Sequence, residues 1–583
     1  LTNQAHVQEN STNAGSQDAN AIVQILLQEP FVTISKGTVW TDKAGAVFSP
    51  ATVGPVAFNN SCPSFGGTIN SINLAANPIN SNLAGVDAGD TVRMAVVIEN
   101  TGRNAAYDVL AHDALPAGMS FVPGSVCVTN GAGAAIPYSG NANDFVTSGI
   151  TLTSLGRGKM SDGTVVATGS NIAIITYNVT IDATSEALHS YTNTATLTNY
   201  AGQPGGPNHI PGGRTDTATV TLAPFSAAKT LVNTNQLFTT GNNVAIGEIV
   251  TYRVTISVPE GTTTNVIARD TLPAGMAFVD CLAVNASAGV TSTIGAWANA
   301  CNDNTNPVIT SDGTISTWNL GTITNSNNDA AAELVQLDYS AVVLNAGVRG
   351  NTRQNNVSVS YTGNGSTQTA AAAGPIITIV EPTLQVVKTV APTTGDAGDS
   401  VLYTVVISHA AASNTYAFNA HVRDDLSTLP LTLGSLSSVT FTGATCGTPV
   451  VTNASTGTVV DLTIDVLPTG CSASFTYAAT LTSGASAAQV ITNTANIDWS
   501  SLPGSVSGQT PYEGTPSLDC ERSGNTADCG GATNNYRASD PATVTVPTTP
   551  VKSLVSTSEG HTSAAQLAIG EIASIYIDIS PRR

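Results

Sequence analysis

The chain has 583 residues, which at about 150 residues per domain corresponds to roughly four domains, and only 10% of them are charged. The 39 Asp and Glu outnumber the 19 Lys and Arg, and the net charge of −20 argues against a protein that binds nucleic-acid phosphates or an anionic membrane surface. The 41% hydrophobic content does not fit a disordered chain, and no run of about 18 apolar residues predicts a membrane span.

The sequence repeats at a long period, which determines the predicted fold. A Gly-acid motif opens each copy, as in Asp87-Ala-Gly-Asp90 and Ile246-Gly-Glu248, and a signature such as Ile491-Thr-Asn-Thr-Ala-Asn-Ile497 closes it. We expect residues 1–29 to be the C-terminal strands of a preceding repeat and residues 548–583 the N-terminal strands of a following repeat, within a longer repetitive polypeptide. Three complete repeats are expected between them, at residues 30–223, 224–380 and 381–547.

Apolar residues alternate with other residues inside the repeats, as at Val92, Met94, Val96 and Ile98. Thr, Val, Ile and Tyr dominate these runs, while Gly, Asn and Pro mark the turns, which is typical of short antiparallel strands with one buried face. The sequence therefore predicts an all-β protein of tandem immunoglobulin-like β-sandwich domains. Because the repeats exceed the roughly 100 residues of a minimal sandwich, their loops must be enlarged, and residues 38–83 form the clearest insertion.

Short motifs follow one another in a fixed order: Lys-Thr, Gly-[Asp/Glu]-x-Val-x-Tyr, Asp-x-Leu-Pro-x-Gly, Trp-x-Leu-Gly and Thr-Asn-Thr-Ala-x-Val. The second repeat contains Asp270-Thr-Leu-Pro-Ala-Gly275 and Trp318-Asn-Leu-Gly321, whereas the third lacks Leu-Pro-Ala-Gly after Asp424. In this order the chain resembles the domain-of-unknown-function-eleven family, tandem sandwich repeats of secreted bacterial and archaeal proteins. The resemblance implies surface exposure and a spacer role, and it implies no catalytic activity.

Eight cysteines are spread along the chain, two in the first repeat, two in the second and four in the third. They form no C-x-x-C pair and no Cys/His cluster with zinc-ligand spacing. An even number of cysteines in a Thr-, Asn- and Gly-rich chain fits an oxidising, extracytoplasmic compartment. The simplest pairing is local, with free buried thiols as the alternative: Cys62–Cys127, Cys281–Cys301, Cys446–Cys471 and Cys520–Cys529.

Four of the six lysines occupy one repeat position, five or six residues after a proline: Lys36, Lys229, Lys388 and Lys552. In the expected strand, Lys388 shares its parity with Leu384 and Val386, so it points toward the core, and the same holds for Lys36 and Lys229. An unpaired buried ammonium is prohibitively costly, so each lysine must be neutral, paired or chemically altered.

Two further polar residues in each repeat share the apolar parity of their strands. In the third repeat Asn493 aligns with Ile491 and Ile497, and Asp424 aligns with Val422. The corresponding residues of the other repeats are Asn193, Asn355, Asp113 and Asp270. Three polar side chains per repeat are therefore expected to meet in one core.

This set resembles the triads of collagen-adhesin and pilin sandwich domains, in which a first-strand Lys attacks a last-strand Asn carboxamide beside a carboxylic acid. Burial is expected to lower the lysine pKa, which frees the amine as nucleophile, and to raise the Asp pKa, so that its carboxyl can shuttle protons as ammonia leaves. The alternatives are a buried Lys–Asp ion pair completed by Asn, or a lysine that extends to solvent. The resemblance implies three isopeptide bonds, Lys36–Asn193, Lys229–Asn355 and Lys388–Asn493, with Lys552 and Asn3 as half-sites.

The sequence contains no H-E-x-x-H, G-x-S-x-G or Walker motif, so we predict that the protein is not an enzyme and needs no cofactor. Acidic turns such as Asp87-Ala-Gly-Asp90 could bind Ca²⁺, but they match no EF-hand loop and are interpreted as solvated turns.

The sequence predicts a structural protein: a stiff stalk or filament outside the cell, on its surface, whose partners are neighbouring repeats or protomers of the same protein. Short Pro-containing linkers at residues 222–225 and 380–383 leave little room for flexing. The alternative is an adhesin whose enlarged loops bind a host, surface or glycan ligand. Aromatic residues make up only 5% of the chain, which weakens that alternative because binding hot spots favour Trp, Tyr and Arg.

Overall fold

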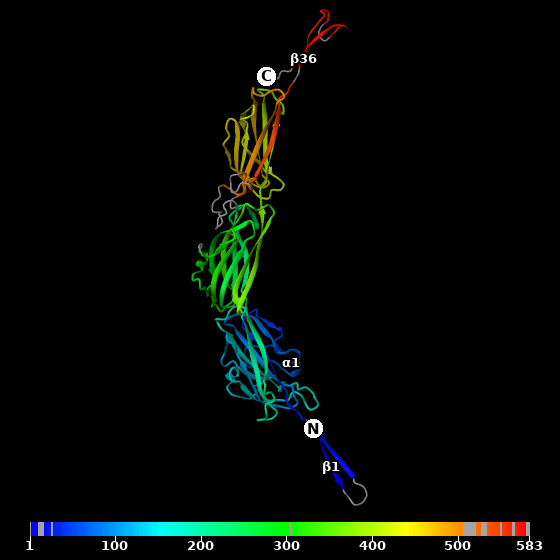
Figure 1. Ribbon diagram of the computed structural model, residues 1–583, viewed down its shortest axis with the longest axis vertical. Helices are drawn as coiled ribbons and strands as arrows, with labels where there is room; N and C mark the ends of the chain where they lie inside the picture. The colour runs from blue at the N-terminus through cyan, green and yellow to red at the C-terminus, as the bar shows by residue number, and fades with distance from the viewer. Residues whose placement is uncertain are drawn as a thin grey trace.

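Three β-sandwiches stand end to end in the computed structural model, with one hairpin beyond each end (Figure 1). The structure describes residues 2–9, 17–24, 27–302, 305–329, 331–504, 521–525, 533–548, 551–562 and 566–578. Within these ranges the secondary structure is almost entirely β, with a single short α-helix, α1 (Ser71–Ala76), and two 3-10 turns (Ala142–Val146 and Trp297–Cys301). The predicted all-β class is confirmed.

The first repeat has one sheet in the order β3-β6-β12-β8, with β9 also on β12, and a second in the order β10-β11-β7-β13-β14-β5-β4. The strands of the first sheet are β3 (Val32–Thr41), β6 (Thr91–Asn100), β8 (Met119–Phe121), β9 (Cys127–Asn130) and β12 (Ile172–Ile181). Those of the second are β4 (Val47–Ser49), β5 (Asn82–Val86), β7 (Ala106–Ala114), β10 (Tyr138–Ser139), β11 (Ile150–Leu155), β13 (Ser190–Ala201) and β14 (Arg214–Leu222).

The second repeat pairs its strands in the orders β15-β17-β23-β19 and β16-β25-β24-β18-β22-β20, with β21 also on β22. The first sheet consists of β15 (Ser226–Thr234), β17 (Ile249–Val258), β19 (Met276–Ala286) and β23 (Glu333–Val343). The second consists of β16 (Asn243–Ala245), β18 (Gly261–Thr271), β20 (Val290–Ser292), β21 (Val308–Thr310), β22 (Ile315–Asn325), β24 (Thr352–Gly363) and β25 (Ser366–Val380).

The third repeat has the sheets β26-β27-β33-β29, with β30 also on β33, and β31-β32-β28-β34-β35. Its strands are β26 (Leu384–Ala391), β27 (Ser400–His409), β28 (Ala417–Asp425), β29 (Leu431–Leu436), β30 (Thr440–Thr442), β31 (Val451–Asn453), β32 (Val459–Leu467), β33 (Ser472–Leu481), β34 (Val490–Ser500) and β35 (Arg537–Thr545). The terminal hairpins are β1 (Thr2–Glu9) with β2 (Gln17–Gln24), and β36 (Val551–Thr557) with β37 (Ala573–Asp578).

One strand order is common to all three sandwiches. In one sheet the opening strand pairs with the second strand, which pairs with a later long strand: β3-β6-β12, β15-β17-β23 and β26-β27-β33. In the other sheet the order is β7-β13-β14, β18-β24-β25 and β28-β34-β35. Equivalent positions of the three repeats therefore occupy equivalent places, each in the core of its own sandwich.

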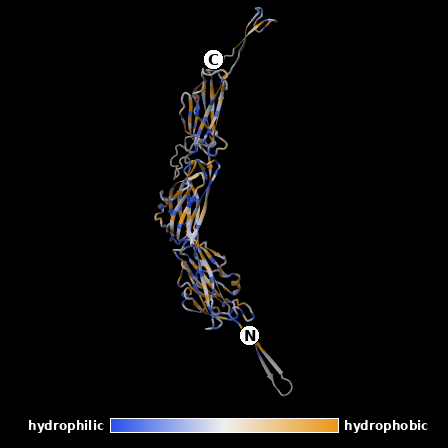
Figure 2. Cartoon of the chain, viewed as in Figure 1, coloured by the Kyte–Doolittle hydropathy of each residue, from blue (hydrophilic) through white to orange (hydrophobic). Residues whose placement is uncertain are grey.

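The core lies between the two sheets of each sandwich. Along β17 the buried residues Val250, Tyr252, Val254 and Ile256 alternate with partly exposed ones, because successive side chains of a strand point to opposite faces. The apolar and polar residues are interleaved along the strands of all three sandwiches (Figure 2). This is the period-two pattern of the sequence.

The insertion in the first repeat forms an additional layer. Ile69, next to α1, and Leu74 of α1 pack on Val97 and Ile174, which lie on the outer face of the first sheet, so β6 and β12 are buried on both faces. Arg93 is buried beneath the same insertion and donates to the side chains of nearby polar residues, including Asn178 at 2.8 Å. The sequence identified this segment only as an enlarged loop.

The Gly-acid motif closes a tight turn before the second strand of each repeat. Asp90, Glu248, Asp399 and Glu571 each accept a hydrogen bond from the backbone N–H of the residue three positions earlier, at 2.6–2.8 Å. A carboxylate that satisfies the backbone in this way has a structural role. The interpretation of this motif as a turn is confirmed, but the expectation that the Asp87-Ala-Gly-Asp90 turn is solvated is wrong, because Asp87 and Asp90 are both buried.

Candidate functional site

The three repeat lysines are fully buried. The side chains of Lys36, Lys229 and Lys388 have 0% of their surface exposed, on β3, β15 and β26. The alternative in which these lysines extend to solvent is therefore wrong. The side chain of Lys552 and the side chain of Asn3 lie outside the described residues.

In the first repeat, four polar side chains meet between the sheets. The Nζ of Lys36 contacts Oδ2 of Asp113 and donates to the hydroxyl of Tyr177 at 2.8 Å. That hydroxyl donates to Oδ2 of Asp113 at 2.6 Å and accepts from Nδ2 of Asn193 at 2.9 Å. A hydroxyl has one proton and two lone pairs, so all hydrogen-bonding capacity of Tyr177 is used within this set. We call the Lys, Asp, Asn and Tyr of one repeat its lysine cluster.

The second repeat builds the same cluster. The Nζ of Lys229 contacts Oδ2 of Asp270 and donates to the Tyr339 hydroxyl at 2.5 Å. Nδ2 of Asn355 donates to the same hydroxyl at 2.6 Å. All four side chains lie inside the sandwich.

The third repeat has the same four members, but its lysine donates to the aspartate and not to the tyrosine hydroxyl. Nζ of Lys388 lies 2.5 Å from Oδ2 of Asp424, and the Tyr477 hydroxyl donates to that oxygen at 2.5 Å. Nδ2 of Asn493 donates to the Tyr477 hydroxyl at 2.8 Å. Nζ of Lys388 lies closest to an aromatic ring at Tyr403, 4.6 Å from its centroid.

Each cluster joins the two sheets of its sandwich. The Lys and Tyr come from one sheet, for example β3 and β12, and the Asp and Asn from the other, for example β7 and β13. The clustered Asn was expected on the last strand of the repeat, but it lies on the last strand but one, because β14, β25 and β35 follow. Asp113 is opposite Ala195, so Asp113 and Asn193 are diagonal neighbours on adjacent strands.

The tyrosines were not singled out from the sequence, although a signal is present. In each repeat the tyrosine precedes the clustered asparagine by 16 residues. A buried Tyr is common in sandwich cores, so the type of residue alone did not mark it. The constant spacing relative to Asn is the feature that could have identified it.

A second carboxylate lies next to the lysine in two of the repeats. Oδ2 of Asp216 on β14 accepts the backbone N–H of Lys36 at 2.7 Å, and Oδ2 of Asp540 on β35 accepts that of Lys388 at 2.7 Å. The strand register puts Ala372 at the corresponding position of the second repeat. The middle cluster therefore lacks this negative charge.

The lysine pKa values differ between the repeats, and the second carboxylate is the smallest of the contributions that raise them. Burial lowers the pKa of Lys36 and of Lys388 from 10.5 to about 8, against the opposing effect of their neighbouring carboxylates. Burial lowers the pKa of Lys229 to about 6. Burial, reinforced by Asp113, also raises the pKa of Tyr177 well above 10, so that hydroxyl stays protonated.

Two oxygens of every cluster are buried without a hydrogen-bond partner among the described residues. They are Oδ1 of the aspartate and Oδ1 of the asparagine, in all three repeats: Asp113, Asn193, Asp270, Asn355, Asp424 and Asn493. A buried acceptor without a donor costs about 1–3 kcal/mol.

Three disulfides lie in the three repeats, one in each. They are Cys62–Cys127, Cys281–Cys301 and Cys446–Cys471, the local pairs expected from the repeat boundaries, and they rule out free thiols at these positions. The fourth expected pair, Cys520–Cys529, lies outside the described residues.

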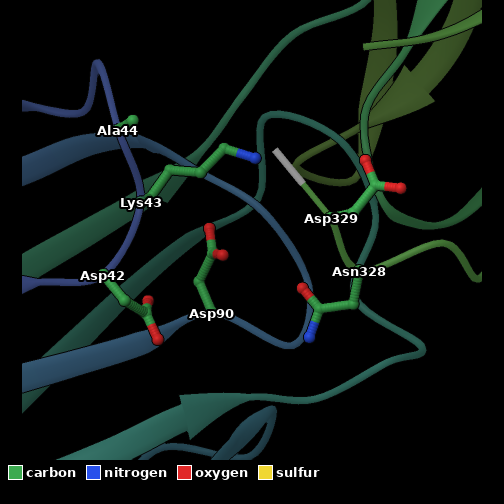
Figure 3. Close-up of a pocket in the computed structure, with 6 residues that line it drawn as sticks. All are labelled: Asp42, Lys43, Ala44, Asp90, Asn328 and Asp329. Atoms are coloured by element: carbon green, nitrogen blue, oxygen red, sulfur yellow. The ribbon is translucent and has the colours of Figure 1, made fainter. Parts of the chain in front are cut away.

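A pocket at the junction of the first and second repeats contains the acidic turn that could bind Ca²⁺. Figure 3 shows Lys43 and Asp90 facing this pocket, with Asn328 and Asp329 of the second repeat on the other side. Nζ of Lys43 lies 2.6 Å from Oδ2 of Asp87, so an ammonium already compensates one of the two carboxylates of this turn. In the part of the chain that the structure describes, no group of three His, Cys, Asp or Glu side chains is arranged to hold a metal ion.

In the described part of the chain, no helix is long and apolar enough to cross a membrane.

Comparison with known proteins gives distant structural similarities. The C-terminal domain of the Streptococcus agalactiae AgI/II polypeptide BspA aligns over 48% of this chain and 97% of its own length, with 13% identity and a TM-score of 0.27. The full-length major pilin SpaD from Corynebacterium diphtheriae aligns over 70% of this chain and 81% of its own, with 12% identity and a TM-score of 0.22. The major pilin subunit BcpA of Bacillus cereus aligns over 61% and 84%, with 13% identity and a TM-score of 0.22.

These TM-scores are too low to indicate a shared function. No protein-family model matches the chain, so membership of the domain-of-unknown-function-eleven family stays a prediction. No curated protein matches it either.

Proposed function

We propose that the chain is the structural repeat region of an extracellular, cell-surface protein, a stiff stalk or filament segment whose sandwiches are closed by Lys–Asn isopeptide bonds. The observation that carries this proposal is the repetition of one buried Lys–Asp–Asn set in three sandwiches that stand end to end (Figure 1).

Contacts between the first two repeats support a stiff stalk. The loop after β12 inserts into the second repeat, where Ala187 joins the hydrophobic core and its backbone N–H donates to Oγ1 of Thr263 at 3.1 Å. The backbone N–H of Thr262 donates to the carbonyl of Ser185 at 3.0 Å. A bend at this junction would have to withdraw a buried apolar side chain.

The junction of the second and third repeats contains a buried ion pair. Arg522 lies 2.5 Å from Glu381 and donates to Oδ1 of Asn345 at 2.9 Å and to the carbonyl of Gly347 at 2.8 Å. Arg522 belongs to the third repeat, whereas Asn345 and Gly347 belong to the second. Since the guanidinium is rigid and planar, these bonds fix the orientation of one repeat on the other.

The disulfides support a location outside the cytoplasm. Disulfides persist in oxidising compartments and are rare where glutathione keeps thiols reduced. One disulfide in each repeat fits a protein that works outside the cell.

The cluster has the groups that isopeptide formation requires. Transfer of a proton from Lys to the contacting Asp gives a neutral amine and a carboxylic acid. The amine attacks Cγ of Asn, the C–N bond to Nδ2 breaks, and ammonia leaves with one proton that came from the amine. The new amide would connect the opening strand to the last strand but one across both sheets.

Intact mass measurement of the full chain tests the bonds. We expect a mass three ammonia molecules below that calculated from the sequence with its disulfides formed. Lys36→Met, Lys229→Met and Lys388→Met should each lack only two ammonia molecules relative to the mass calculated for that variant. Lys159→Met, which changes a loop lysine, should still lack three. A wild-type mass with no ammonia missing would leave the buried Lys–Asp ion pair as the correct interpretation.

Immunogold labelling of intact cells of the source organism tests the location. An antibody against residues 30–547 should label filaments or projections at the cell surface. Labelling only after permeabilisation would contradict the proposal.

A further inference from the structure

Isopeptide formation requires a proton to move from the attacking nitrogen to the leaving nitrogen. The nucleophile is Nζ of Lys and the leaving group is Nδ2 of Asn. In the first repeat these are Lys36 and Asn193, and one side chain lies within hydrogen-bond distance of both: Tyr177, at 2.8 Å and 2.9 Å.

We propose that Tyr177, Tyr339 and Tyr477 are catalytic residues of isopeptide formation, whose hydroxyls carry the proton from the lysine amine to the departing asparagine nitrogen. This inference rests on the proposed function, because it assigns a step of the same bond-forming reaction.

The contact with the leaving nitrogen is the same in every repeat. Nδ2 of the asparagine donates to the tyrosine hydroxyl at 2.9 Å, 2.6 Å and 2.8 Å in the first, second and third repeats. The aspartate in contrast faces the nucleophile, since its Oδ2 contacts Nζ of the lysine. The tyrosine hydroxyl also accepts from Nζ of the lysine in the first and second repeats, whereas in the third Nζ of Lys388 and the Tyr477 hydroxyl meet at the same oxygen of Asp424.

The proton balance is closed within the cluster. The aspartate first accepts a proton from the lysine ammonium, which leaves a neutral amine. When the amine attacks, Nζ loses a second proton to the tyrosine oxygen, while the tyrosine gives its own proton to Nδ2. The C–N bond to Nδ2 then breaks, ammonia leaves, and the hydroxyl ends in its original form.

The hydroxyl is suited to this relay because it remains protonated. Burial raises the pKa of Tyr177 and of Tyr339 well above 10. A hydroxyl in this state can donate and accept at the same moment, whereas a phenolate could only accept.

The second repeat offers a matched control. Tyr252 lies beside Tyr339 in the same sheet, with the two ring centroids 5.8 Å apart, and its ring also faces Nζ of Lys229 at 5.0 Å. Its buried hydroxyl has no hydrogen-bond partner among the described residues. Removing this hydroxyl changes the same core without touching the proposed relay.

The experiment follows ammonia loss in the full chain after refolding from an unfolded preparation, by intact mass and by mapping of the cross-linked peptides. We expect Tyr339→Phe to slow formation of the Lys229–Asn355 bond by about 10²-fold or more, the usual contribution of general acid–base catalysis. Tyr252→Phe should react at the wild-type rate, and the bonds of the other two repeats should form normally in both variants.

Folding is checked in a background that cannot react. Lys229→Met and the double variant Lys229→Met/Tyr339→Phe should show the same unfolding midpoint in urea, so that a slower bond is not explained by a poorly folded repeat. If Tyr339→Phe disturbs the fold, the same comparison is made with Tyr177→Phe and Tyr477→Phe in their own repeats.

The outcomes separate the two proposals. Full bond formation at the wild-type rate in the Tyr→Phe variants overturns the relay and leaves the isopeptide bonds standing. Absence of ammonia loss in the wild-type chain overturns the bonds themselves, and the relay with them.

Discussion

A buried lysine is tolerated in each sandwich because the surrounding side chains compensate the loss of water. In the first repeat, Lys36 has Asp113 and the Tyr177 hydroxyl as direct partners, and Asp216 adds a negative charge near its backbone. In the second repeat Ala372 stands in place of this second carboxylate. The three clusters therefore provide a natural comparison at the scale of single residues.

The lysine pKa values predict a pH dependence of bond formation. The reactive pair of neutral amine and carboxylic acid carries the same number of protons as the Lys–Asp ion pair, so the rate is constant below the lysine pKa and falls about tenfold per pH unit above it, where that proton is lost. With a pKa of about 6, Lys229 should react nearly tenfold more slowly at pH 8 than at pH 7. With pKa values of about 8, Lys36 and Lys388 should slow by only about twofold over the same range.

Exchange of the second carboxylate tests its contribution to the lysine pKa. Ala372→Asp should raise the pKa of Lys229 and make the second repeat faster at pH 7, while Asp540→Ala should lower the pKa of Lys388 and make the third repeat slower. Peptide mapping after refolding at each pH gives the three rates in one sample. Identical pH profiles for all three repeats would contradict the assignment.

At the scale of elements, the first repeat differs through its insertion. The segment between β3 and β5 covers the outer face of the first sheet, and Cys62 in this segment is bonded to Cys127 on β9. The disulfide thus holds the added layer onto the sandwich. Gly37 on β3 lets the backbone of the inserted segment approach the sheet closely, because a Cβ at that position would lie 2.9 Å from the backbone nitrogen of Asn80.

Removal of this disulfide should destabilise the first repeat. Replacing Cys62 and Cys127 by Ser should lower the free energy of unfolding by about 4 kcal/mol, because the bond spans 65 residues. The Cys281–Cys301 bond spans 20 residues, and its removal from the second repeat should cost about 3 kcal/mol. Differential scanning calorimetry of both variants measures the two losses; a larger loss in the second repeat would refute the loop-length explanation.

At the scale of the whole molecule, the junctions determine whether three sandwiches behave as one rod. Glu381 is buried between Arg522 and the hydroxyl of Tyr536, which donates to it at 2.8 Å. Loss of the arginine would leave this carboxylate buried without its cation. Breaking a buried ion pair by removing one partner costs about 3–5 kcal/mol.

Arg522→Met should therefore loosen the junction of the second and third repeats. Small-angle X-ray scattering should show a shorter average maximum dimension and a broader distance distribution than for the wild type. Arg423→Met is the control, because the ion pair of Arg423 with Asp425 is exposed and should contribute less than about 1 kcal/mol. An unchanged scattering profile for Arg522→Met would show that other contacts suffice to keep the rod straight.

Much of the fold was predictable because it depends on local patterns. Strand periodicity requires only that successive side chains point to opposite faces, and the repeated Gly-acid turn marks the start of the second strand each time. Parity alone was also sufficient to place Lys36, Asp113 and Asn193 on the inner faces of their strands, and the structure buries all three. These are properties of single strands, which a sequence contains.

The sequence could not determine which strands pair across the sandwich or what lies between their side chains. The tyrosine on β12 meets the lysine on β3 and the asparagine on β13 only through the packing of two sheets, and Asp216 reaches the lysine backbone only because β14 lies beside β3. The insertion likewise becomes a layer only when its apolar residues find the outer face of β6 and β12. Local alternation determined the strands of this protein and the inward face of each polar residue; long-range packing decided which side chains meet in the lysine clusters, because their contacting members are separated by 16 to 141 residues of chain.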